Sequence, residues 1–67
     1  MSSFLSLWQH YKGDYYRVIC TARMEADASI VVVYQSELLG HIWVRPLDVW
    51  NEEIKPGQRR FTRVAPP

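Results

Sequence analysis

The chain has 67 residues, of which 48% are hydrophobic, 13% aromatic and 22% charged. This length allows one small domain, and the composition differs from the polar, aromatic-poor composition of disordered segments. The net charge of +1 excludes a strongly polyanion-seeking protein, and the single cysteine excludes an internal disulfide and a cysteine-rich zinc site. No apolar run is long enough for a membrane span, and the first residues lack the pattern of a secretory signal. The sequence therefore predicts a soluble, cytoplasmic, single-domain protein (residues 1–67) with its core at about 7–64 and a tail at 65–67.

The first third of the chain predicts a β-hairpin. Residues 7–11 form the first expected strand, and residues 15–22 form the second. Gly13-Asp14 predicts a two-residue turn between them, because these residue types tolerate the positive φ of such turns. Alternation along the second strand places four side chains on its apolar face, which we expect to face the core: Tyr16, Val18, Cys20 and Ala22. Cys20 is therefore expected to be buried and inert.

Two more strands are expected in the middle of the chain, after a polar connector at residues 23–29. The β-branched run at residues 30–34 suits a central strand with both faces covered. A break at 36–40 follows, and residues 41–45 then alternate, with Ile42 and Val44 on the opposite face from His41, Trp43 and Arg45. If Ile42 and Val44 face the core, Trp43 and Arg45 lie on the outer face of the domain.

The last third contains a short helix or a strand, and then a second hairpin. Residues 46–50 predict either one helical turn that begins with Pro46 or the approach to a strand at residues 49–54. Pro56-Gly57 predicts a type II turn that leads into a last strand at 59–64. About five short strands without a long helix predict a mainly all-β protein, and the chain length favours a small curled β-barrel of SH3-like type.

Several segments occur together in a characteristic order: Trp8–Ile19, Ala22-Arg23, Val32–Gln35, Trp43–Asp48 and Arg60-Phe61. In this combination the chain resembles the bacterial family called domain of unknown function 1653, and Trp43-Val44-Arg45-Pro46-Leu47 is the most specific part of the match. The chain departs from the family pattern at the break 36–40, which is shorter here, and just after Arg23. The resemblance implies a compact prokaryotic domain and implies no activity, cofactor or catalytic residue.

Residues that could carry catalysis or bind a metal do not form a recognisable motif. His10, His41 and Cys20 lack the short ligand spacing of a structural zinc site, and no nucleophile or phosphate-loop motif is present. Glu52 and Glu53 are adjacent, so in a strand they point to opposite faces. We therefore expect no metal, no cofactor and no enzymatic activity. A small hydrolase or transferase with His10 or His41 as its base is the third-ranked hypothesis.

Basic residues gather after position 54, where four stand without an acidic residue: Lys55, Arg59, Arg60 and Arg63. Such a strand could follow a phosphate backbone, which makes nucleic-acid binding the alternative function. Basic side chains on an edge strand also prevent aggregation between sheets, and this structural role explains the same pattern.

A second group of residues combines arginine with aromatic rings. Arginine binds carboxylates and phosphates bidentately and stacks on rings, and both tryptophan and arginine are frequent in binding hot spots. The expected ligand-binding residues lie on the outer face of the strand at 41–45 and beside it: Arg17, Arg23, Tyr34, His41, Trp43 and Arg45. A purely structural role for Trp43 and Arg45 is the alternative. The predicted function is a non-enzymatic binding module, a monomer or weak homodimer, whose partner is a peptide, a protein or a small anion.

Overall fold

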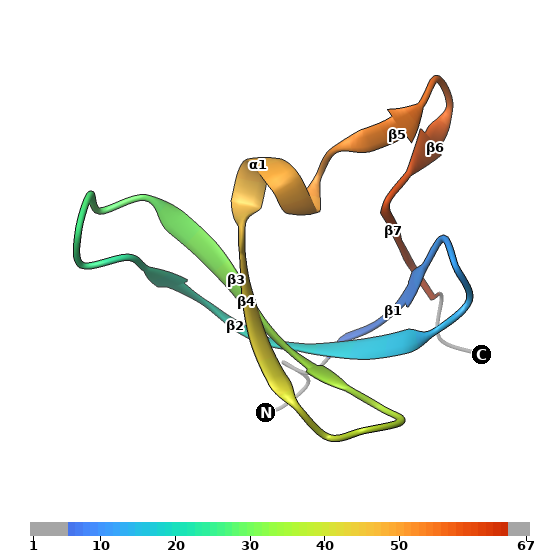
Figure 1. Cartoon of the computed structure of the whole chain (residues 1–67), viewed down its shortest axis with the longest axis horizontal. Coiled ribbons are helices and arrows are strands. Elements are labelled where there is room, and N and C mark those ends of the chain that lie inside the picture. The colour runs from blue at the N-terminus through green and yellow to red at the C-terminus, as the bar shows by residue number, and fades with distance from the viewer. Residues whose placement is uncertain (1–5, 65–67) are drawn as a thin grey trace.

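The computed structural model describes residues 6–64, which form strands and one short helix. Five strands make an antiparallel sheet in the order β4-β3-β2-β1-β7, and β5 and β6 form a separate two-stranded hairpin (Figure 1). The element bounds are β1 Ser6–His10, β2 Tyr15–Arg23, β3 Ile30–Ser36, β4 Ile42–Pro46, α1 Leu47–Trp50, β5 Glu53–Lys55, β6 Gln58–Arg59 and β7 Phe61–Arg63. The mainly-β prediction is therefore confirmed. The strands described here form an open sheet, without the closed barrel that the sequence predicts.

The two predicted turns differ in how closely they match the structure. Gly57 has φ 82°, the positive value that the third position of a type II turn requires, and it joins β5 to β6. Gly13 also has a positive φ, 111°, but the connection from β1 to β2 is longer than the predicted two residues and spans residues 11–14. The His10 N–H donates to the Asp14 carbonyl at 2.8 Å and closes this loop.

The predicted last strand at 59–64 is divided at Arg60. The Arg60 N–H donates to the Glu52 carbonyl at 3.0 Å, and its own carbonyl accepts from the Tyr11 N–H at 2.9 Å. These two bonds point to different partners, so β6 stays with β5 while β7 pairs with β1. Upstream, the helical alternative is the one observed, since α1 begins directly after Pro46. No helix among residues 6–64 is long and apolar enough to cross a membrane.

The sheet is curved, and α1 and the β5–β6 hairpin lie on its concave side (Figure 1). The core lies on the same side of the sheet, because it includes Trp50 of α1. Its buried members are Val32, Tyr34, Trp50 and Phe61. The rings of Trp50 and Phe61 stack with their centroids 3.8 Å apart and 9° between their planes. We call this side of the sheet the inner face and the opposite side the outer face. Large rings fill the volume between the inner face and α1, which a domain this small needs for stability.

A β-bulge reverses the predicted faces of the second half of β2. Val18 lies opposite Tyr34 on the inner face, but Cys20 lies opposite Val33, because the pairing shifts by one residue between Val18 and Cys20. An extra residue in one strand exchanges the two faces beyond it. The predicted burial of Cys20 is therefore wrong, and its thiol is exposed.

The faces of β4 are also the reverse of those predicted. Ile42 and Val44 are 61% and 58% exposed on the outer face. Trp43 lies opposite Tyr34 and therefore shares the inner face with the core. Alternation correctly separated the two sets of side chains, but it did not indicate which set faced inward.

Candidate functional site

A pocket of about 290 Å³ opens on the inner face of the sheet, beside the core. Its walls carry five rings and three other side chains: His10, Tyr16, Tyr34, Trp43, Phe61, Ser36, Leu39 and Arg45. Drug-sized ligands usually occupy pockets of roughly 300–1,000 Å³. This pocket is therefore suited to one side chain or a small organic group.

The strand register brings these residues together from distant parts of the chain. Tyr34 lies opposite Trp43 across β3 and β4, and His10 lies opposite Phe61 across β1 and β7. Directly opposed residues of antiparallel strands point to the same face of the sheet. The pocket therefore depends on the pairing of the first strand with the last.

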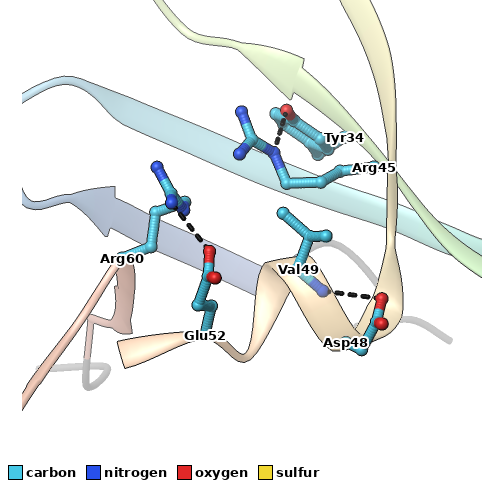
Figure 2. Close-up of polar contacts among 6 residues, drawn as sticks. All are labelled: Tyr34, Arg45, Asp48, Val49, Glu52 and Arg60. Atoms are coloured by element: carbon cyan, nitrogen blue, oxygen red, sulfur yellow. Dashed lines mark hydrogen bonds and ion pairs between the residues drawn. The ribbon is translucent and has the colours of Figure 1, made fainter. Parts of the chain in front are cut away.

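Arg45 is the arginine in the pocket wall. Its Nε–H donates to the hydroxyl of Tyr34 at 3.1 Å, and its guanidinium carbon lies 5.4 Å from the centroid of the Phe61 ring. Figure 2 shows the guanidinium directed to the Tyr34 hydroxyl through this single bond. Among residues 6–64, Arg45 makes no ion pair with a carboxylate. Its terminal N–H groups are consequently available to a ligand.

Arg60 adds to the positive surroundings of His10, which lines the pocket. Arg60 donates to Glu52 Oε1 at 2.8 Å (Figure 2), while its Nε is buried and has no hydrogen-bond partner in the described part of the chain. Burial lowers the pKa of His10, and the charges of Arg45, Arg60 and Lys12 lower it further, against an opposing effect of Asp14. The same positive charges that disfavour an imidazolium favour a bound anion.

Two hydroxyl groups complete the polar lining of the pocket. Burial raises the pKa of Tyr16, and the charge of Asp14 and the nearby Tyr34 raise it further, against an opposing effect of Arg45, so its phenol keeps its proton at neutral pH. The Ser36 hydroxyl accepts a bond from the Leu39 N–H at 3.0 Å and keeps its own proton free to donate. The site thus offers arginine, phenol and hydroxyl donors between aromatic walls.

The structure brings together only part of the predicted site. Tyr34, Trp43 and Arg45 converge in the pocket, although on the inner rather than the outer face. His41 packs edge-on against the Trp43 ring, with centroids 5.8 Å apart. Arg17 forms an ion pair with Glu37, and Arg23 donates to the Ala28 carbonyl at 2.8 Å, where it holds the connector before β3.

Sequence reasoning did not assign five of the pocket residues to the site: His10, Tyr16, Ser36, Leu39 and Phe61. Tyr16 was assigned to the core, and Phe61 belongs to both the core and the pocket wall. The available signal was the alternation of Tyr16 with Val18, which places the Tyr16 ring on the same face as the core.

The basic residues near the C-terminus do not form one uninterrupted surface. Arg59 lies opposite Glu53 in the β5–β6 hairpin, and Arg60 is bonded to Glu52. Arg63 lies opposite Trp8 at the other end of the segment. In residues 6–64 there is also no group of three or more histidine, cysteine, aspartate or glutamate side chains placed to hold a metal ion.

Comparison with known proteins gives a family and a related structure. The sequence model of the family described as "Protein of unknown function (DUF1653)" matches residues 6–66. A crystal structure of a protein belonging to DUF1653 from Bordetella bronchiseptica is 32% identical to this chain, with a TM-score of 0.77, and the match covers 94% of this chain and 92% of that one. Comparison with curated proteins gives no match. The fold that carries the pocket is thus shared with a solved relative, and the chain belongs to the DUF1653 family.

Proposed function

We propose that this protein is a non-enzymatic binding module whose inner-face pocket recognises a carboxylate group. The observation that carries the proposal is Arg45, half-buried between rings and without a carboxylate partner among residues 6–64. A positive charge in such surroundings interacts more strongly with an anion than it would in bulk water. A guanidinium also matches the planar geometry of a carboxylate.

The walls of the pocket support a ligand that joins an acidic group to an apolar or aromatic one. The Tyr16, Tyr34 and Phe61 rings pack edge-to-face against one another, and Tyr34 and Phe61 are buried. Trp43, also in the pocket wall, is 49% exposed and leaves ring surface for a flat group. The volume suits an acidic side chain of a peptide or a small aromatic acid. SH3 domains bind peptides in aromatic-lined grooves. We propose an SH3-like relationship for this domain, because its sheet is curved (Figure 1).

A titration with phenylacetate, followed by NMR on the isotope-labelled protein, tests the proposal. The neutral isostere phenylacetamide is the matched ligand control. We expect phenylacetate to shift the signals of His10, Tyr16 and Trp43 and phenylacetamide to bind at least about tenfold more weakly, since hydrogen bonds to charged groups contribute roughly 1.5–3 kcal/mol.

Two arginine variants locate the binding group. Arg45→Gln removes the guanidinium from the pocket and should abolish the preference for phenylacetate over the amide. Arg17→Gln removes a guanidinium that is paired with Glu37 outside the pocket and should leave the preference unchanged. Equal binding of the acid and the amide, or an unchanged preference in Arg45→Gln, would overturn the proposal.

We do not propose nucleic-acid binding as a second function. The basic residues that suggested it are interrupted by acidic partners, since Arg59 faces Glu53 and Arg60 is bonded to Glu52. The binding module is proposed to act in the cytoplasm, as a monomer or a weak homodimer.

A further inference from the structure

Strand β4 is an edge of the sheet, and half of its backbone groups point away from β3. The Ser36 N–H donates to the His41 carbonyl at 2.9 Å, and these two residues occupy the next position of the β3–β4 register. In an antiparallel ladder, hydrogen-bonded and non-hydrogen-bonded pairs alternate. The backbone groups of Trp43 and Arg45 therefore face β3, whereas those of Ile42 and Val44 face the free edge.

The free edge of β4 is protected at its end, by the inward-pointing Arg45 and by Pro46, but its outward-facing side chains carry no charge. Natural edge strands are blunted by charged residues, internal prolines or bulges. Ile42 and Val44 are exposed aliphatic residues, and the turn before β4 adds Leu38 and Leu39, which are 80% and 65% exposed. The other edge of the sheet, β7, carries Thr62 and Arg63, and both are exposed.

The free edge and the pocket are continuous. Leu39 and Trp43 line the pocket and also belong to the edge strand or to the turn before it. A residue opposite Trp43 on an added strand would point to the inner face, with the two Cβ atoms about 4.5–5.5 Å apart. Arg45, two residues along β4, lies about 7 Å from Trp43 on that face, within reach of an acidic side chain.

We propose that β4 takes an extended segment of a partner protein as an added strand, with an acidic residue opposite Trp43 that binds Arg45 in the pocket. The residues on either side of the acidic one lie opposite Ile42 and Val44, and they are apolar because those two side chains form an aliphatic outer surface. The recognised segment is thus apolar–acidic–apolar in an extended conformation. Charge complementarity with Arg45 selects this partner, and the inference rests on the proposed function of the pocket.

A capped peptide with Val-Glu-Val at its centre and threonine on both sides is the probe, and NMR titration of the full chain is the measurement. Replacing the glutamate by glutamine removes the charge. Methylating the backbone nitrogens of the two valines removes the donors of the added strand and keeps the carboxylate. We expect each change to weaken binding about tenfold or more, since the first removes a charged hydrogen bond and the second removes two amide donors.

The binding site on the protein is tested with Val44→Lys, which places a charge on the free edge and leaves the pocket residues unaltered. This variant should weaken peptide binding by about tenfold, the size of effect expected when a charge is introduced at an apolar contact, and keep phenylacetate binding. Equal affinities for the plain and the N-methylated peptide, with phenylacetate still bound, would overturn strand addition and leave the proposed function intact. If the unmodified protein does not bind phenylacetate either, both strand addition and the proposed function of the pocket are overturned. Concentration-dependent dimerisation that broadens the Ile42 and Val44 signals and excludes the peptide would assign the edge to a second copy of this chain, against the proposal.

Discussion

The inner and outer faces of the sheet differ in what covers them. On the inner face, Trp50 of α1 and Phe61 of β7 bury Val32 and Tyr34. On the outer face, Ile42 and Val44 remain largely exposed, although they are as apolar as Val32. Apolar character alone therefore does not determine which face of the sheet forms the core. The inner face is buried because the C-terminal segment folds back over it, and the large rings lie where that segment can reach them.

The largest effect on the free energy of unfolding is expected at the Phe61 ring, which lies in the core between the sheet and α1. Phe61 is 2% exposed and stacks on Trp50, so Phe61→Ala leaves a cavity between the sheet and α1. We expect a loss of about 3–5 kcal/mol in the free energy of unfolding, measured by urea denaturation. For a chain this small, such a loss removes most of the stability. A loss below about 1 kcal/mol would show that the core can close around the missing ring.

A matched pair of valines compares the two faces directly. Val32 and Val44 are chemically identical, but Val32 is 3% exposed and Val44 is 58% exposed. Val32→Ala should lower the free energy of unfolding by about 1–3 kcal/mol, and Val44→Ala should change it by less than about 0.5 kcal/mol. Urea denaturation of both variants under the same conditions measures the two changes in the free energy of unfolding. Equal losses would mean that the outer face is covered in solution.

The free energy of unfolding should depend on pH through His10, which lines the inner-face pocket. The pKa of His10 is lowered in the folded protein, so the folded state binds fewer protons than the unfolded state around this pKa. Its contribution to stability is therefore complete above the unfolded pKa of about 6.5 and decreases as the pH falls through the folded pKa. Urea denaturation from pH 7.5 to pH 5, in the wild type and in His10→Gln, measures the difference. A wild-type curve with the same slope as the variant would contradict this expectation.

The smallest expected effect on stability is at Cys20, which the bulge in β2 places outside the core. Cys20→Ser should change the free energy of unfolding by less than about 0.5 kcal/mol, because the side chain is exposed. A thiol reagent should also label Cys20 of the native protein as quickly as it labels the unfolded chain. Protection of the native thiol would place Cys20 on a covered surface.

The features that could be predicted from the sequence are those set by neighbouring residues. The turn at Pro56-Gly57 follows from the φ preferences of those two residues, and the strand predicted at residues 30–34, which the structure extends to Ser36, follows from its β-branched side chains. The two alternatives for residues 46–50 stayed open because a single helical turn has no periodicity to distinguish it from a loop.

The features that could not be predicted depend on contacts between distant residues. The bulge between Val18 and Cys20 is defined by the pairing of β2 with β3, and no residue type in β2 predicts it. Arg45 and Trp43 were identified from their residue types, but the pocket also needs His10 and Phe61 from opposite ends of the chain. His10 and Phe61 lie opposite each other because β1 pairs with β7. The pattern of residues within either strand does not predict that pairing.

The pairing of β1 with β7 has a consequence for the order of events during synthesis. The hairpins β1–β2, β2–β3 and β3–β4 join neighbouring segments, so they can form as soon as those segments have been made. Phe61 comes more than fifty residues after Trp8 along the chain, and until it is present the aromatic side of the nascent sheet is covered by α1 alone. Contacts between distant segments form slowly, and uncovered apolar surface promotes aggregation in the meantime. A chain that has not yet paired β7 with β1 is therefore more prone to aggregate than the complete domain.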